Sequence, residues 1–114
     1  MFHDHAQIDQ MFQALADPAR RLMMERLSRG PASVSELAEP FDMSLSAVAQ
    51  HIRLLQASGL IASEKIGRVR TCRIEPKALR TVEQWIAERR TVWERRFDRL
   101  GDFLAEQSEI KAEE

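Results

Sequence analysis

The sequence predicts a mainly helical fold with one small β-hairpin, made of five helices and two short strands. In the first, fourth and fifth helical segments, apolar residues recur every three or four positions, which is the spacing of a helix that buries one face. Two further segments alternate β-branched with polar residues on either side of a glycine, which is typical of a hairpin. A chain of 114 residues supports one modest core. We therefore expect a single domain over residues 1–114.

The first helix is predicted over about residues 6–16, and a second helix follows it directly. The apolar residues of the first helix have helical spacing: Ile8, Met11, Phe12 and Leu15. Asp17 and Pro18 end this helix and begin the next, with Asp17 as the N-cap and Pro18 as the first helical residue. The second helix runs to Gly30 and Pro31, since both residue types disfavour a helix interior.

Two short helices come next, joined by a turn of only a few residues. The third helix begins near Ser33 or Ser35, either of which can serve as N-cap, and Pro40 limits it to about two turns. The fourth is capped by Ser44 and closed by Gly59. Its apolar stripe consists of Leu45, Val48, Ile52 and Leu55. Such a pair predicts a helix-turn-helix whose second member is the candidate recognition helix.

A hairpin and a long helix complete the chain. Residues 60–66 and 69–74 are the two predicted strands, and Gly67 and Arg68 form the tight turn between them. After a helix-turn-helix, such a hairpin is the wing of a winged helix-turn-helix fold. Pro76 opens the last helix, which is predicted to reach about residue 107. Its apolar residues are spaced three, four or seven positions apart: Leu79, Val82, Ile86, Trp93, Phe97, Leu100 and Leu104.

The charge of the chain is unevenly distributed. Residues 51–80 contain seven basic and two acidic residues, a net charge of +5, whereas residues 1–50 and 81–114 each carry −3. A positive face on an otherwise negative protein suits a surface that follows the phosphates of a nucleic acid. The alternative is a merely solvated hairpin. The candidate phosphate contacts on the wing are Lys65, Arg68 and Arg70.

Helical angles sort the side chains of the recognition helix into two faces. At about 100° per residue the apolar stripe faces the core, and Ser46, Gln50 and Arg53 lie on the opposite side, free to enter a major groove. Ser44 begins this surface. His51 lies at the shoulder of the apolar stripe, which fits a partly buried structural histidine, with a DNA contact as the alternative. These five are the candidate DNA-binding residues of the helix.

Four spaced motifs occur in a fixed order along the chain. They are Leu-Ala-Asp-Pro-Ala-Arg-Arg at 15–21, Val-Ser-Glu-Leu-Ala at 34–38, Ser-Leu-Ser-Ala-Val-Ala-Gln-His-Ile at 44–52, and Ser-Gly-Leu-Ile at 58–61 with Gly-Arg at 67–68. Together they resemble the arsenic-repressor-like (ArsR/SmtB) winged helix-turn-helix regulators over roughly residues 8–75. The resemblance implies a homodimeric repressor that binds inverted repeats of double-stranded DNA and releases them when an effector binds. Ala49 and Gln50 stand where family members often have Ser and Lys or Arg, and this difference bears on the operator sequence.

The metal ligands of the best-known members of that family are missing. Ser33 and Ser35 stand where arsenic- and cadmium-type members carry two cysteines, and the last helix has no histidine. His3 and His5 could bind zinc by composition, but we expect them in a terminal tail. Cys72 is expected to be a half-buried strand residue, since no second thiol could trap an oxidised form. We therefore expect a non-metal-sensing member without cofactor, whose partners include a small-molecule effector of unknown identity.

Two other functions are alternatives to DNA binding. An enzyme is disfavoured because the sequence has no Gly-x-Ser-x-Gly, P-loop or His-Glu-x-x-His pattern. A winged-helix module that binds a partner protein instead of specific DNA is the main alternative, and such a wing would carry apolar or mixed-charge residues. No apolar run approaches the roughly 20 residues of a membrane span, and the start of the chain does not resemble a signal peptide. We expect a cytoplasmic protein.

The terminal helices, about residues 6–16 and 76–107, are predicted to form a dimer interface. The last helix offers more apolar surface than a small core can cover, and large exposed apolar patches usually mark interfaces. Arg89 and Arg96 fall within the same apolar arc, where they would either reach carboxylates across the interface or cover apolar surface with their stems. The candidate interface residues are Met11, Phe12, Trp85, Trp93, Phe97, Leu100 and Leu104.

Overall fold

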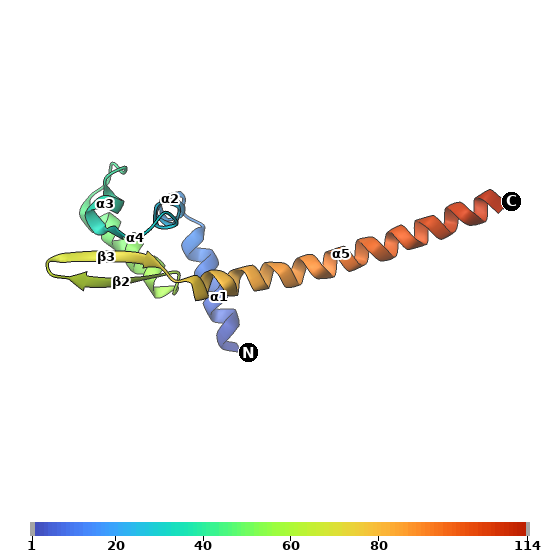
Figure 1. Cartoon of the computed structure of the whole chain (residues 1–114), viewed down its shortest axis with the longest axis horizontal. Helices are drawn as coiled ribbons and strands as arrows, with labels where there is room; N and C mark the ends of the chain where they lie inside the picture. Colours follow the sequence, from blue (N-terminus) through green and yellow to red (C-terminus); the bar gives the residue numbers. More distant parts are fainter. Residues whose placement is uncertain (1, 114) are drawn as a thin grey trace. The chain divides into compact units, whose positions relative to one another are not determined.

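Five helices and three strands make up the part of the chain that the computed structural model describes, namely the backbone of residues 2–113 and the side chains of residues 6–110 (Figure 1). In order they are α1 (Phe2–Leu15), α2 (Pro18–Leu27), β1 (Ala32–Ser33), α3 (Val34–Ala38), α4 (Leu45–Ala57), β2 (Ile61–Ile66), β3 (Val69–Ile74) and α5 (Pro76–Glu113). This arrangement confirms the predicted winged helix-turn-helix fold. The described residues divide into two units, 2–82 and 83–113, which are considered separately below.

The junction between α1 and α2 is built by its local sequence, as predicted. Asp17 has an extended backbone, and its carboxylate accepts a hydrogen bond from the backbone N–H of Arg20 at 3.1 Å. Pro18 is the first helical residue, a position where a missing N–H leaves no bond unmade. Arg20 and Arg21 donate back to carbonyl oxygens at the end of α1. The junction therefore satisfies backbone groups of both helices.

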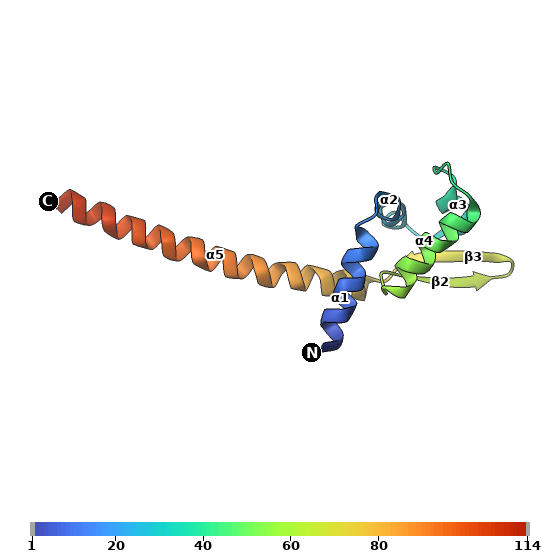
Figure 2. The same ribbon diagram turned by 180° about the vertical axis from the view of Figure 1, so that it is seen from behind.

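The helix-turn-helix consists of α3 and α4. Of the two candidate caps for α3, Ser33 is the one used: its hydroxyl accepts from the backbone N–H of Glu36 at 3.1 Å, and the Glu36 carboxylate accepts from the backbone N–H of Ser33 at 3.3 Å. Ser44 caps α4 through the N–H three residues on. Gly59, with a φ of 86°, turns the chain out of α4. Figure 2 shows α4 running from beside α3 to the start of β2.

The wing is the β2–β3 hairpin, which belongs to an antiparallel sheet with strand order β1-β3-β2. β2 pairs with β3 along its whole length, from Ile61 opposite Ile74 to Ile66 opposite Val69. Gly67 between them has a φ of 64°, a conformation that glycine adopts at little cost in a two-residue loop. β2 and β3 were expected from the sequence, whereas β1 was not, because two residues are too few to show an alternating pattern.

The core of residues 2–82 draws side chains from α1, α2, α3, α4 and the sheet. Its most deeply buried large side chains are Met11, Met23, Leu37, Val48, Leu55, Leu60, Ile61 and Cys72. The prediction that Leu45 belongs to this core is wrong, because its side chain is 66% exposed. A helical angle gives the direction of a side chain but not its position along the helix axis. Leu45 is the first residue of α4, so it points toward the core side but lies at the end of the helix. Cys72 is fully rather than half buried, and this burial raises the pKa of its thiol.

α5 is a single helix of 38 residues and ends later than predicted. Its beginning belongs to the first unit, where Ala78 is buried and Leu79 and Val82 pack against the core. In the second unit, every described side chain from 88 to 110 is exposed. Within residues 2–113, no helix is both long enough and apolar enough to cross a membrane.

Replacing Asp17 with alanine is expected to lower the free energy of unfolding by about 1 kcal/mol at neutral pH, because the N-cap hydrogen bond is lost. That bond, from the backbone N–H of Arg20, holds the pKa of Asp17 below its ordinary value. A carboxyl whose pKa is lower in the folded than in the unfolded protein stabilises the fold at pH values above its unfolded-state pKa. This contribution is lost as the pH falls through its folded-state pKa. Urea unfolding at about pH 7 and pH 3 should show the difference shrinking in acid.

Asp17→Asn is the matched control for this measurement. Asparagine keeps a capping oxygen that does not titrate, so its advantage over alanine should be the same at both pH values. An effect of Asp17→Ala that does not change with pH would show that the carboxylate charge contributes nothing to the cap.

Candidate nucleic-acid interface

The exposed face of α4 carries the polar side chains that we predict to read DNA. Ser46, Gln50 and Arg53 are exposed, whereas Val48 on the other side of the helix is fully buried. The Ser44 hydroxyl is also exposed, and while it accepts the N-cap hydrogen bond it can still donate its own proton. The structure thus brings these polar residues onto one surface, and their contact with DNA stays a prediction.

The wing presents two cations on one face. Lys65 and Arg70 are direct cross-strand partners, and such partners project to the same side of a sheet. Arg68, the third candidate, is exposed in the loop. Farther along β3, Arg73 lies 3.3 Å from the carboxylate of Glu75, which reduces its net charge locally. Lys65, Arg68 and Arg70 are therefore the wing cations best placed to meet phosphates.

The tip of the wing also carries an apolar pair. Ile66 and Val69 flank the two-residue loop as cross-strand partners, and both are more than half exposed. They lie on the opposite face from Lys65 and Arg70, because successive residues of a strand alternate in direction. The wing therefore has a cationic face and, at its tip, an apolar face that was not predicted from its basic residues.

Hydrogen bonds join the wing to the recognition helix. The Ser63 hydroxyl donates to Oε1 of Gln56, in the last turn of α4, at 3.1 Å. Nη1 of Arg70 donates to the same hydroxyl at 2.9 Å. One serine on β2 thus connects a cation on β3 with α4. Gln56 and Ser63 could not be predicted from the sequence, because only the folded arrangement of α4 and β2 brings them together and no motif marks them.

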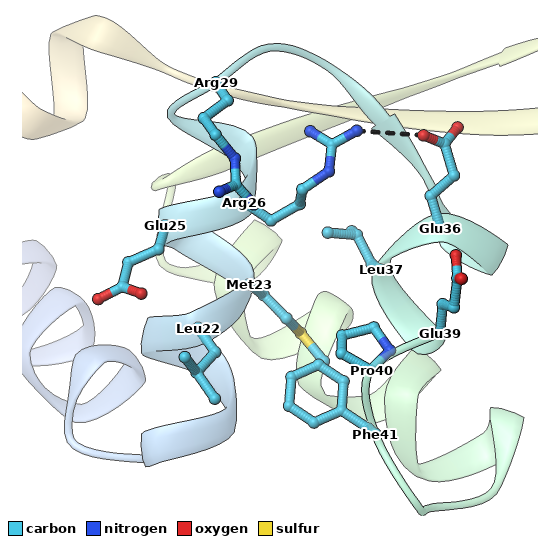
Figure 3. A pocket seen from close by; sticks show the side chains of 10 residues that line it. All are labelled: Leu22, Met23, Glu25, Arg26, Arg29, Glu36, Leu37, Glu39, Pro40 and Phe41. Carbon is cyan, nitrogen blue, oxygen red and sulfur yellow. Dashed lines mark hydrogen bonds and ion pairs between the residues drawn. The ribbon is translucent and has the colours of Figure 1, made fainter.

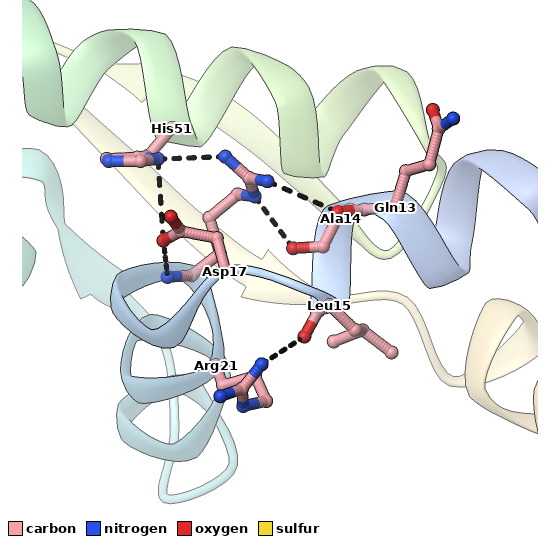
Figure 4. A network of polar contacts seen from close by, with 7 residues as sticks. Gln13, Ala14, Leu15, Asp17, Arg21 and His51 are labelled. Atoms are coloured by element: carbon pink, nitrogen blue, oxygen red, sulfur yellow. Dashed lines mark hydrogen bonds and ion pairs between the residues drawn. The ribbon is translucent and has the colours of Figure 1, made fainter.

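Arg20 joins three helices behind this surface. From α2, its Nε donates to the carbonyl oxygen of Ala14 at 2.7 Å and its Nη2 to that of Gln13 at 3.2 Å, both near the end of α1. Its Nη1 lies 3.0 Å from Nδ1 of His51 on α4. Figure 4 shows the carbonyl groups and the histidine ring converging on this network.

His51 is partly buried, in agreement with its predicted position at the shoulder of α4. Its side chain is 22% exposed, and its Nδ1 lies 4.0 Å from Oδ2 of Asp17, too far for a hydrogen bond. The other ring nitrogen points away from the network (Figure 4). The contact with Arg20 therefore involves Nδ1, and Nε2 lies outside this network.

The residues predicted for the dimer interface differ in their exposure. Met11 is fully buried in the core and offers no surface to a partner, because α1 packs there against α2 and α4. Phe12 is partly exposed and Trp85 partly buried. Trp93 and Phe97 stack with their ring centroids 5.3 Å apart. The large apolar side chains of α5 that are at least half exposed are Val92, Trp93, Phe97, Leu100, Phe103, Leu104 and Ile110.

Arg89 already has partners within its own chain. Its guanidinium carbon lies 4.6 Å from the ring centroid of Trp85, and its Nη1 lies 3.5 Å from the carboxylate of Glu88. Such cation–π contacts favour a charge beside an aromatic ring. Both contacts lie within the chain, and whether Arg89 also reaches a carboxylate across a dimer interface stays a prediction.

The candidate metal ligands are not brought together in the described part of the chain. Among those residues, no three or more His, Cys, Asp or Glu side chains form a group that could hold a metal ion. The Ser33 hydroxyl is engaged as the N-cap of α3. The backbone of His3 and His5 belongs to α1 rather than to the expected tail, and their side chains lie outside the described residues.

A pocket of about 540 Å³ lies between α2 and α3 (Figure 3). Met23, Leu37 and Phe41 are among the apolar side chains that line it. An ion pair between Arg26 and Glu36, 3.1 Å long, reaches from α2 to α3 at its edge. The size and the mixture of apolar and charged groups are those of a small-molecule site.

Comparison with known proteins relates this chain to regulators of transcription. A family model described as a helix-turn-helix domain matches residues 15–64, which include α2, α3 and α4. The HTH-type transcriptional regulator Rv2034 of Mycobacterium tuberculosis is 39% identical over 71 residues, which cover 62% of this chain and 66% of that protein. The chain spans about half to two thirds of the length of the first curated relatives that it matches.

Solved structures agree over more of the chain. The crystal structure of the ArsR family transcriptional regulator RHA00566 is 55% identical, with a TM-score of 0.74, and the match covers 78% of this chain and 92% of that one. An ArsR-like transcriptional regulator from Rhodococcus sp. RHA1 is 29% identical, with a TM-score of 0.77, and the match covers 90% and 94% of the two chains.

Proposed function

Because the chain belongs to the ArsR family of transcriptional regulators, we propose that it is a homodimeric, cytoplasmic repressor that binds an inverted-repeat operator. DNA binding and homodimerisation are typical of this family. In our proposal α4 enters the major groove and the wing follows the backbone. The observation that carries it is the arrangement of α4 and the wing: Ser63 links the exposed polar helix to a hairpin whose Lys65 and Arg70 share one face.

The proposed dimer is supported by the second unit. Its apolar side chains recur along one face of α5, and they are exposed in the single chain. Exposed apolar surface of this extent usually marks an interface. A twofold dimer would present two recognition helices, so the half-sites should lie about 34–36 Å apart, or a multiple of this distance. Selection from a random duplex library should therefore return an inverted repeat with this spacing.

Gln50→Ala and Arg68→Ala are expected to weaken operator binding in two different ways. Gln50 can form two hydrogen bonds with adenine, so its loss should cost about 1–3 kcal/mol and relax the base preference at one position per half-site. Arg68→Ala should weaken binding to all duplex sequences alike. If each subunit loses one phosphate contact, the slope of log affinity against log salt should fall by about 1.8. Binding titrations over a range of salt concentrations, on the operator and on base-substituted duplexes, measure both effects.

Arg29→Ala is the control for a lost cation, because Arg29 is exposed but lies outside α4 and the wing. It should leave both the slope and the base preference unchanged. An unaltered slope in Arg68→Ala would mean that Arg68 does not touch the backbone. A wild-type protein that binds no duplex at low salt would instead favour the protein-interaction module, for which the exposed Ile66 and Val69 would be the first contacts to test.

We propose that no metal controls operator binding. The proposal rests on serine hydroxyls at positions 33 and 35, which are poor ligands for soft metals, and on a last helix without histidine. Titration of zinc, nickel, cadmium or arsenite into the protein–DNA complex should leave the affinity unchanged. A saturable loss of binding at stoichiometric metal would contradict this expectation, and a variant that begins at Ala6 would then test His3 and His5.

Our candidate effector site is the pocket between α2 and α3. A small amphipathic molecule there would touch both the apolar lining and the charged rim, and it would bear directly on the first helix of the helix-turn-helix. Native mass spectrometry of the protein purified from its host would detect a retained molecule. Its loss from a Phe41→Ala variant would support this site, whereas its retention would place the effector elsewhere.

A further inference from the structure

The contact between Arg20 and His51 determines which nitrogen of the histidine carries a proton. The two nitrogen atoms, Nη1 of Arg20 and Nδ1 of His51, are 3.0 Å apart. A guanidinium group has only N–H donors and does not lose its proton in proteins. Nδ1 must therefore accept this hydrogen bond with its lone pair. In a neutral imidazole the proton then resides on Nε2.

The guanidinium of Arg20 is held in the orientation that this contact needs. Its Nε and Nη2 already donate to the carbonyl oxygens of Ala14 and Gln13, at 2.7 and 3.2 Å. Asp17, the acidic neighbour, is 4.0 Å from Nδ1, and its carboxylate accepts from the backbone N–H of Arg20 instead. If Nδ1 carried the proton, two donors would face each other at 3.0 Å with no acceptor in reach.

We propose that Arg20 is a positioning residue that holds His51 as the Nε2–H tautomer, so that α4 presents an N–H donor to a phosphate oxygen of bound DNA. The DNA contact rests on the proposed function, whereas the tautomer does not. Nε2 points away from the Arg20 network (Figure 4). His51 lies at the shoulder of α4 and is mostly buried, so it is set back from the base-reading face formed by Ser46, Gln50 and Arg53. A donor in that position suits the backbone of the groove edge rather than a base.

The tautomer can be read directly in the free protein. Two-bond ¹H–¹⁵N correlation spectra distinguish the two nitrogens of each ring, and the chain has only three histidines. The signal that disappears in His51→Gln identifies His51. We expect a pure Nε2–H pattern in the wild type and a mixture of tautomers in Arg20→Gln. A wild-type ring protonated on Nδ1, or one that is already a mixture, would overturn the proposal.

Arg21→Gln is the matched control for Arg20→Gln. Arg21 is the adjacent residue and caps the same end of α1, through the carbonyl oxygen of Leu15 at 2.7 Å, but no bond joins it to His51 in the structure. Loss of this cap should leave the His51 spectrum as in the wild type. An equal change of tautomer in both variants would mean that the helix junction as a whole, not the Arg20 contact, determines the state of the ring.

Two substitutions of His51 separate its two nitrogens for DNA binding. The side-chain oxygen of asparagine can take the place of Nδ1 and accept from Arg20, but asparagine has no donor at the position of Nε2. The amide of glutamine can reach that position and donate. We therefore expect His51→Asn to weaken operator binding about tenfold or more, because a dimer loses two contacts, and His51→Gln to stay within about threefold of wild type.

Two comparisons complete the DNA test. Adding Arg20→Gln to His51→Asn should weaken binding no further, since a positioning residue acts only through its partner. The effect of His51→Asn should be the same on the operator and on base-substituted duplexes, because a phosphate contact carries no base preference. A changed base preference, or undiminished binding by His51→Asn, would overturn the phosphate contact while leaving the proposed function intact. A wild-type protein that binds no duplex would overturn both the phosphate contact and the proposed function. The spectrum of the free protein would still test the tautomer.

Discussion

A Leu100→Glu substitution is expected to make the protein monomeric at micromolar concentration and to weaken operator binding at least about a hundredfold. Leu100 lies within the exposed apolar face of α5 and is 50% exposed in the single chain. If this face is the dimer interface, the substitution buries an unpaired carboxylate, which costs several kcal/mol. A monomer also loses its contact with the second half-site. Two joined binding sites typically bind with an affinity about 10²–10⁴ times that of a single one. Sedimentation equilibrium and operator titration measure the two effects.

Thr91→Glu is the matched control. Thr91 is exposed in the same helix, and nine residues at about 100° each place it on the side opposite Leu100. The Thr91→Glu substitution adds the same charge as Leu100→Glu, and it should change neither the molecular mass in solution nor the affinity for the operator. A dimeric Leu100→Glu protein would show that the apolar face of α5 does not hold the dimer together.

Leu55→Ala is expected to lower the free energy of unfolding by about 2–5 kcal/mol. Leu55 is fully buried in the last turn of α4, and removing most of its side chain leaves a cavity that its neighbours fill only in part. Small domains are stable by only about 5–15 kcal/mol, so the loss is a large share of the total. Urea unfolding should be measured at one protein concentration, because the stability of a dimer depends on it.

The neighbouring Leu54 provides the control, since it is the same residue type in the same helix but 45% exposed. Leu54→Ala should cost well under half as much as Leu55→Ala, because less apolar surface leaves the interior. Equal losses at the two positions would mean that α4 is rotated about its axis relative to the structure described above.

The sequence predicted those features that depend on a few neighbouring residues. The caps Asp17 and Ser44 and the loop glycine Gly67 have local chemistry that marks a helix start or a tight turn. The helical period of α4 also predicted which of its faces is exposed, except at Leu45. A period gives the direction of a side chain, but it does not show that the end of the helix lies outside the core.

Contacts between distant residues could not be predicted in this way. Arg20 and His51 are 31 positions apart, and their contact needs the packing of α2 against α4. The bonds through Ser63 need the strand register. Helical spacing identifies Met11 as part of an apolar face but does not show which other element covers that face. For a related reason α1 begins earlier and α5 ends later than the sequence predicts, since polar residues can extend a helix without adding to its apolar face.

The burial of Cys72 gives the protein an internal reporter of its own opening. The chain has a single cysteine, in the central strand of the sheet, and it is fully buried with a raised pKa. A thiol reagent can reach it only when the helices and strands packed around it separate, so the rate of labelling measures how often this domain opens. No engineered probe or isotope is needed. Operator DNA or an effector that tightens the winged domain would slow this labelling, so that binding can be followed from inside the fold by chemistry at one sulfur atom.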